Sequence, residues 1–152
     1  MPMLKRFASS ALLLALALSV AFAAGCKDPY GACVKASSTV ATAIAQAYPA
    51  IDADRQSGLL TVSQELKFDG FLNVANTLNG QFQTCVSGVH SAKGAAASYA
   101  GCAQTFANGV SNASELANLN IVNASEQAKI TAIAQSISTG LQALITSLGS
   151  GN

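Results

Sequence analysis

The sequence NASEQAKITAIAQSISTGLQALITSLG at residues 123–149 carries the clearest helical pattern in the chain. Its large aliphatic residues recur at spacings of three and four, which places them on one face of an α-helix. They are Ile130, Ile133, Ile137, Leu141, Leu144 and Leu148. Asn123, followed three residues later by Glu126, resembles the start of a capping box. The pattern therefore predicts a final amphipathic helix, followed by a flexible tail over residues 149–152.

The stretch that begins at Asp28 predicts a first helix. Asp28 suits the N-cap and Pro29 suits the first helical position, where a missing N–H costs nothing. Pro49 is expected to kink or interrupt this helix, because proline removes a helical hydrogen bond. The apolar face is expected to contain Tyr30, Cys33, Val34, Val40, Ile44 and Ile51.

A second helix is predicted after Gly58, with Ser63 as its N-cap. Its buried stripe is expected to contain Leu66, Phe71, Val74, Leu78, Phe82, Cys85 and Val89. Three glycines within it, Gly70, Gly80 and Gly88, each weaken a helix by about 1 kcal/mol relative to alanine. They are expected to mark local bending or close approach of another helix.

A turn at residues 91–94 precedes a third predicted helix. Its apolar positions are Tyr99, Cys102, Phe106 and Val110. The Asn/Ser-rich residues 108–114 predict a break, and residues 115–119 a short helical piece. Together these elements predict an all-α fold, a small antiparallel bundle of three to four helices in a single domain at residues 26–152.

The N-terminal segment has the three parts of an export signal. Lys5 and Arg6 precede an apolar stretch at residues 7–22, and small residues follow it. This order is typical of a signal peptide, which is removed from the mature protein. We therefore assign residues 1–25 to a signal peptide and exclude them from the folded domain.

The junction Ala23-Ala24-Gly25-Cys26 resembles the lipobox of bacterial lipoprotein precursors, and the resemblance covers residues 1–26 only. In that family the cysteine becomes the acylated first residue of the mature chain. The resemblance thus implies lipidation of Cys26, with residues 26–28 as a tether to the lipid bilayer. Lys27 stands where lipoproteins retained in the inner membrane carry aspartate. Attachment to the outer membrane, facing the periplasm or the cell surface, is therefore expected.

Two other fates of this segment remain open. Cleavage after Ala21-Phe22-Ala23 also satisfies the small-x-small rule and would release a secreted, soluble domain that retains Cys26. Alternatively, the apolar segment could stay uncleaved as a membrane anchor, since it approaches the roughly 20 residues that a span needs.

Composition argues against a nucleic-acid partner. The whole chain has a formal charge of +1, and charged residues make up 10% of it. After the signal peptide, six Lys and Arg residues face seven Asp and Glu residues. No basic stripe is available to neutralise phosphates.

The cysteines predict a disulfide. In an antiparallel hairpin, two residues lie side by side when their numbers average to the centre of the turn. Cys85 and Cys102 average to the predicted turn at residues 91–94, and Cys33 and Cys85 average to the turn near Gly58. An exported protein forms disulfides, and we predict the Cys85–Cys102 pair, with Cys33–Cys85 as the alternative. If Cys26 is acylated, one cysteine is left over.

The sequence contains no convincing catalytic, cofactor or metal motif. His90 is the only histidine and suits the C-terminal end of a helix. A zinc set of His90 with Cys33, Cys85 and Cys102 lacks paired C-x-x-C spacing. We therefore expect no enzyme activity, no cofactor and no metal.

Two classes of function remain. The first is a membrane-tethered, non-enzymatic structural or interaction module that contacts an envelope protein or the cell wall. The second is a carrier for a small apolar ligand. Its cavity would be lined by Phe71, Phe82, Tyr99 and Phe106, although aromatic residues at helical spacing usually belong to the core.

Overall fold

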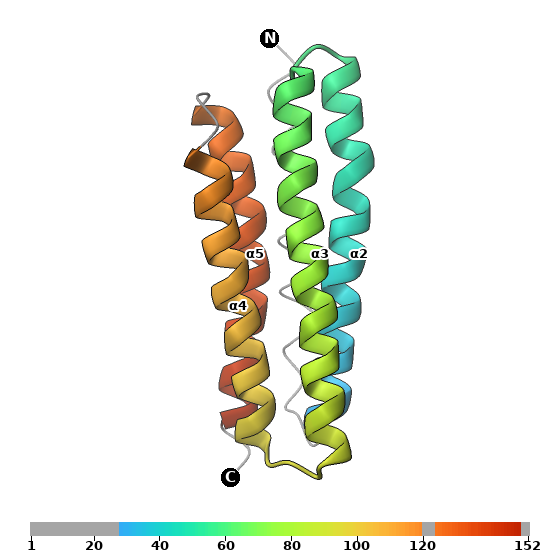
Figure 1. Cartoon of the computed structure of the whole chain (residues 1–152), viewed down its shortest axis with the longest axis vertical. Helices are drawn as coiled ribbons and strands as arrows, with labels where there is room; N and C mark the ends of the chain where they lie inside the picture. The colour runs from blue at the N-terminus through green and yellow to red at the C-terminus, as the bar shows by residue number, and fades with distance from the viewer. Residues whose placement is uncertain (1–27, 120–123, 150–152) are drawn as a thin grey trace.

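The computed structural model describes residues 28–119 and 124–149, which form an up-and-down bundle (Figure 1). Its helices are α2 (Pro29–Gln56), α3 (Val62–Ser91), α4 (Ala96–Leu119) and α5 (Ala124–Gly149). Helix α3 packs between α2 and α4, and α4 packs most extensively against α5. The prediction of an all-α antiparallel bundle is confirmed. None of these described helices is long and apolar enough to cross a membrane.

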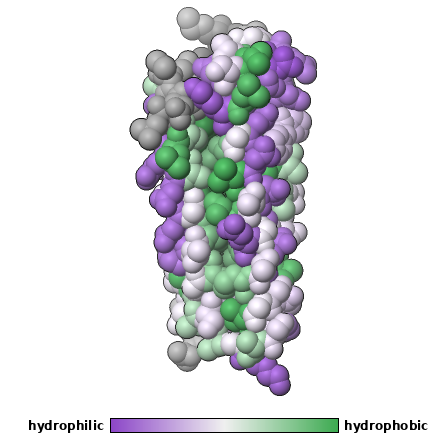
Figure 2. Space-filling model, in the orientation of Figure 1, coloured by the Kyte–Doolittle hydropathy of each residue, from purple (hydrophilic) through white to green (hydrophobic). Residues whose placement is uncertain are grey.

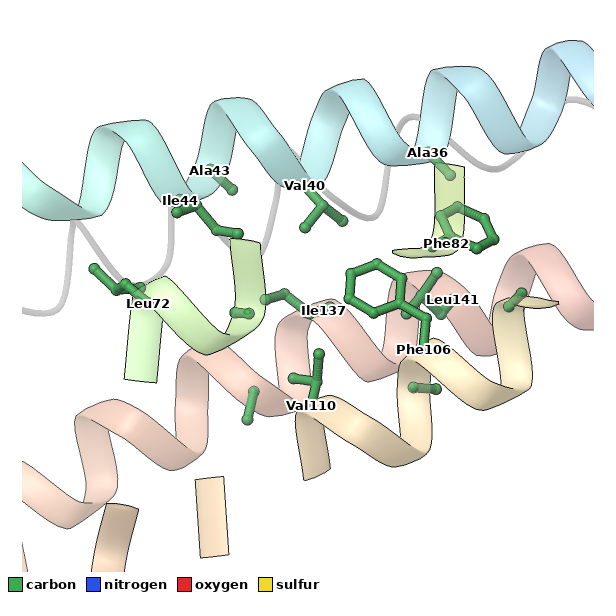
Figure 3. Packing of buried hydrophobic residues seen from close by; sticks show 14 of the residues in the cluster. Ala36, Val40, Ala43, Ile44, Leu72, Phe82, Phe106, Val110, Ile137 and Leu141 are labelled. Carbon is green, nitrogen blue, oxygen red and sulfur yellow. The ribbon is translucent and has the colours of Figure 1, made fainter. Parts of the chain in front are cut away.

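The core runs along the bundle axis and draws side chains from all four helices (Figure 3). The aliphatic stripe of α5 lies where the sequence predicts it. Ile137 and Leu141 are fully buried, and Ile133 is half-buried. The predicted cap at Asn123 and the tail at residues 150–152 lie outside the described residues, and Gly149 is still helical.

Helix α2 begins as predicted and is not interrupted at Pro49. Asp28 occupies the N-cap position and Pro29 the first helical position. The helix continues through Pro49 to Gln56, so the predicted interruption is wrong. Ala47 and Ile51 are buried on either side of the proline, and their packing holds the helix together despite one lost hydrogen bond.

The N-cap of α3 lies two residues before the predicted one. Thr61 is the N-cap, and its Oγ1 accepts a hydrogen bond of 3.2 Å from the Gln64 amide. The Thr61 amide donates to Gln64 Oε1 at 2.8 Å, which completes a capping box. Ser63 was the wrong candidate because the residue three positions after it is Leu66, which cannot return the hydrogen bond.

The buried face of α3 is rotated away from the predicted stripe. Phe71 and Phe82 are buried as expected, but Leu66 and Val74 are 65% and 47% exposed. Cys85 is also exposed. The buried residues of this helix are Phe68, Phe71, Leu72, Ala75, Asn79, Phe82 and Val86. Apolar residues therefore occupy two adjacent faces of α3, and the bundle core covers only one of them.

Helix α4 is continuous, so the predicted break at residues 108–114 and the separate piece at 115–119 are wrong. Ala107, Val110 and Ser114 are buried at helical spacing. Burial of this face outweighs the low helix propensity of the asparagines and serines. The Ser114 hydroxyl is satisfied inside the helix because it donates to the Ser111 carbonyl at 2.8 Å.

A buried polar cluster joins α2 to α3. The Ser37 hydroxyl donates to Asn79 Oδ1 at 2.9 Å, and Asn79 Nδ2 donates to the Ser37 carbonyl at 3.1 Å. Gln83 Nε2 donates to Ser37 Oγ at 2.7 Å. Because a shift along the helix would leave these buried groups without partners, the cluster fixes the register of the two helices.

Helices α2 and α3 end in the same hydrogen-bond pattern at their C-termini. At the end of α2, Gly58 has a φ of 76°, and its amide donates to the Arg55 carbonyl at 3.0 Å. The Leu59 amide reaches back to the Asp54 carbonyl at 2.9 Å. This is a Schellman motif with glycine at the left-handed position.

The end of α3 repeats the motif with a lysine in place of the glycine. Lys93 has a φ of 53°, and its amide donates to the His90 carbonyl at 3.0 Å. The Gly94 amide donates to the Val89 carbonyl at 2.8 Å. The predicted turn at residues 91–94 is confirmed, with an unfavourable residue at its left-handed position.

Candidate functional site

An open apolar groove of about 500 Å³ lies between α3 and α4 on the outer face of the bundle. Its floor and walls include Gly70, Phe71 and Val74 of α3 and Ala113 and Leu116 of α4. Figure 2 shows apolar residues along the middle of this face, with polar residues on both sides. The groove is therefore an exposed apolar surface that the bundle core does not use.

The groove lies between α3 and α4, beyond the residues where these two helices are cross-linked and in close contact. Near the turn, Cys85 and Cys102 form a disulfide with Cα atoms 5.8 Å apart. Further along, a Cβ atom at Gly109 would lie 2.9 Å from a methyl group of Leu78. The absence of a side chain at Gly109 thus permits close approach of the helices, and beyond this point the groove opens.

The groove has both a hollow and a protrusion. No atom outside the helix backbone lies within 4 Å of the position that a Cβ at Gly70 would occupy. Leu116 protrudes beside this hollow, with 64% of its surface exposed. Gly70 was expected to mark bending or close approach, and the structure instead shows open space there, as it does at Gly80 and Gly88.

Charge is nearly absent from the groove. Among the described residues that line it, Lys67 alone is charged, and Asn112 contributes an amide. Exposed large apolar side chains gathered in one place are typical of surfaces that bind another molecule. The arrangement offers apolar contact and shape, and it does not bring together groups suited to acid–base chemistry.

The four residues predicted to line an apolar cavity do not share one. The rings of Phe82 and Phe106 stack in the core with centroids 5.3 Å apart. Tyr99 is buried nearer the N-terminal end of α2, where burial, and then the nearby Cys33 thiol, raise the pKa of its phenol. Only Phe71 of the four lines the groove.

The predicted Cys85–Cys102 disulfide is confirmed. The alternative Cys33–Cys85 pairing is wrong, because Cys85 is bonded to Cys102. Cys26, the predicted lipidation site, lies outside the described residues. Its modification stays a prediction.

His90 lies in the last turn of α3, and its ring stacks on Tyr30 with centroids 3.9 Å apart. This contact ties the end of α3 to the start of α2. Within residues 28–119 and 124–149, no three His, Cys, Asp or Glu side chains gather as a metal site would require.

A second hollow, of about 420 Å³, lies between α2 and α3 beside Val34. It is lined partly by Ser37 and Gln83, which already bond to each other in the buried cluster. Its buried polar groups thus serve the helix pairing, and the α3–α4 groove is the stronger candidate site.

Comparisons with protein-family models, with curated proteins and with solved structures found no match for this chain. The sequence does not reveal the groove, because the spacing of Val74, which lines it, predicts a buried position. The available signal was the width of the apolar stripe on α3, which exceeds what one buried face needs.

Proposed function

We propose that this protein is a non-enzymatic interaction module of the bacterial cell envelope, tethered to the membrane by an acylated Cys26. It makes its contacts through the apolar α3–α4 groove. The observation that carries the proposal is the cluster of exposed apolar side chains at this groove, with Val74 47% and Leu116 64% exposed. Surfaces of this kind are costly to leave in water unless a partner covers them.

The position of the groove suits a tethered module. Cys26 lies two residues before Asp28, and α2 starts at the same end of the bundle as the α3–α4 turn (Figure 1). At about 1.5 Å per helical residue, the groove lies about 20 to 35 Å from that end. A membrane tether at Cys26 would hold the groove away from the anchoring bilayer, where another envelope component can reach it.

Intact mass and membrane fractionation test the tether. We expect the protein from membranes to begin at Cys26 and to carry two or three acyl chains, and Cys26→Ser to release it. An unmodified chain that begins at Ala24 would contradict the tether and favour the secreted form.

Site-specific photo-crosslinking in cells tests the contact surface. A photoreactive residue at Leu116, which lines the groove, should give discrete adducts. The same residue at Val34, which is also exposed but lies on α2, should not. Equal labelling from both positions, or none from Leu116, would contradict a role for the groove.

A small apolar ligand is the second candidate for the same surface. The groove volume falls in the range of about 300–1,000 Å³ that is usual for small-molecule pockets. A ligand carrier should gain thermal stability when lipid extract is added, since binding to the folded state alone raises stability. Leu116→Asp should abolish that gain, whereas Val34→Asp should preserve it.

A further inference from the structure

We propose that the partner of the α3–α4 groove is a second copy of this chain, and that the two copies form a parallel two-fold dimer. In this dimer α3 of each copy faces α4 of the other, and Leu116 of each copy fills the hollow at Gly70 of its partner. The parallel direction of the two chains rests on the proposed tether. The contact between Leu116 and Gly70 rests on the shape of the surface.

The α3–α4 face holds both a protrusion and a hollow of its own. Leu116 is 64% exposed, and the position above Gly70 is empty. A two-fold interface uses the same patch on both subunits, so a patch that binds itself must offer both parts. Side chains that insert into holes on a facing helix are the usual means by which helices pack.

These two residues also lie at nearly the same height along the bundle. In an antiparallel pair, residues at one level have a constant sum of numbers. The disulfide pair Cys85 and Cys102 has the same sum as the contacting pair Leu78 and Gly109. Gly70 and Ala117 also have this sum, so Leu116 lies within one residue of the level of Gly70. A two-fold axis along the bundle preserves heights and brings the partner's Leu116 opposite Gly70.

The proposed tether gives the two chains a common end of attachment. Two chains anchored through Cys26 in one membrane stand side by side and point the same way. An antiparallel dimer would instead place the tethers at opposite ends of the pair. The parallel arrangement also brings α3 against α4, whereas the antiparallel one brings α3 against α3.

The area of the face sets the strength of the contact. The part of α3 that lines the groove, from Lys67 to Leu78, is about 16 Å long, and two packed helices present a face about 20 Å wide. Each copy would thus bury roughly 330 Å² at the groove, which is below the usual size of stable specific interfaces. We expect weak, reversible dimers in solution. On a membrane the tether raises the effective concentration, so that a weak contact suffices.

Cross-linking between two full-length variants tests the geometry. Gly70→Cys and Leu116→Cys are made in separate chains with tags of different size, purified from membranes in detergent, mixed and mildly oxidised. We expect the mixture to form at least about fivefold more cross-linked dimer than either variant alone. Val34→Cys mixed with Leu116→Cys is the control and should stay at the background level.

Each other outcome overturns the proposal. Efficient cross-linking of Gly70→Cys to itself would show an antiparallel pair, and background levels in every mixture would show that the copies do not meet at this face. Sedimentation velocity provides the second measurement. Leu116→Asp should raise the dimer dissociation constant at least about tenfold, and Val34→Asp should not. A wild-type chain that stays monomeric at all concentrations would also refute the dimer.

These results are separable from the test of the proposed function. An acylated but monomeric protein would remove the second copy as the partner and leave the tethered module intact. A dimer that lacks acyl chains would remove the tether and leave the interface intact.

Discussion

The two halves of the α3–α4 pair differ in how they use apolar residues. Near the turn, the disulfide and the stacked Phe82 and Phe106 rings hold the helices together, and Gly109 lets Leu78 approach. Beyond that point the same two helices leave Leu66 and Leu116 in solvent. We refer to these halves as the closed half and the open half of the pair.

The difference indicates a division of roles within one hairpin. The closed half supplies cross-links and buried area, so substitutions there should mainly change stability. The open half also buries core residues such as Phe68 and Leu72, but side chains that face the groove, such as Leu116, are exposed. Substitutions of these exposed residues should leave the fold intact and change binding. The following predictions test this division, starting with the largest effect.

Phe106→Ala should be the most damaging change in the closed half. It removes a side chain that is 2% exposed and stacks on Phe82. Truncation of a buried phenylalanine costs about 3–5 kcal/mol through lost burial and the cavity left behind. Urea unfolding measures this loss. Leu66→Ala in the open half is the control, with an expected change below about 0.5 kcal/mol; comparable losses would refute the division.

Removal of the disulfide should have the next largest effect. Cys85 and Cys102 are 17 positions apart, and closing a loop of this size stabilises by about 3 kcal/mol through the entropy of the unfolded chain. The Cys85→Ala, Cys102→Ala double variant should therefore unfold at a markedly lower temperature. Added reductant should lower the melting temperature of the wild type and have no effect on the double variant. Identical melting curves for the two proteins would show that the staple contributes nothing.

The turns at the two ends of α3 should respond in opposite directions. Gly58→Ala forces a Cβ into a left-handed residue and should cost about 1 kcal/mol. Lys93→Gly relieves the same strain at the other turn and should stabilise by about 0.5–1 kcal/mol. Chemical unfolding of the two variants and the wild type at one pH measures both changes in the free energy of unfolding. A stabilising Gly58→Ala, or a destabilising Lys93→Gly, would contradict the assignment of the two motifs.

The smallest effect on stability is expected in the open half. Leu66→Gln and Leu116→Gln replace exposed side chains and should change the free energy of unfolding by less than about 0.5 kcal/mol. Leu116→Gln should nevertheless lose contacts made by the groove, because Leu116 lines it. A stability loss as large as that of Phe106→Ala would show that these leucines belong to the core.

Much of the fold can be predicted from the sequence, because many of its residue patterns fit only one structure. The stripe from Ile130 to Leu148 fits only an amphipathic helix, and it is buried as predicted. The Cys85–Cys102 disulfide follows from the arithmetic of an antiparallel hairpin once the turn at residues 91–94 is recognised. Errors arose where local propensity and packing disagree, as at Pro49 and at residues 108–114, because tertiary burial keeps both segments helical.

The candidate site was less accessible to sequence reasoning. Leu66 and Val74 are spaced as a buried stripe should be, and only the path of α4 determines that they stay exposed. The buried cluster of Ser37, Asn79 and Gln83 was missed for a related reason. Asn79 and Gln83 lie 42 and 46 positions after Ser37, and nothing local indicates that they meet it.

Hydrogen exchange of backbone amides at low and high protein concentration tests the division of roles most directly. We expect a concentration-dependent slowing of exchange in residues 62–78 of α3 and 109–117 of α4. Amides beside Cys85 and Cys102, and those around Val34, should exchange at the same rate at both concentrations. Rates independent of concentration along all of α3 and α4, or slowing centred on Val34, would contradict the claim that the open half is the face where two copies bind.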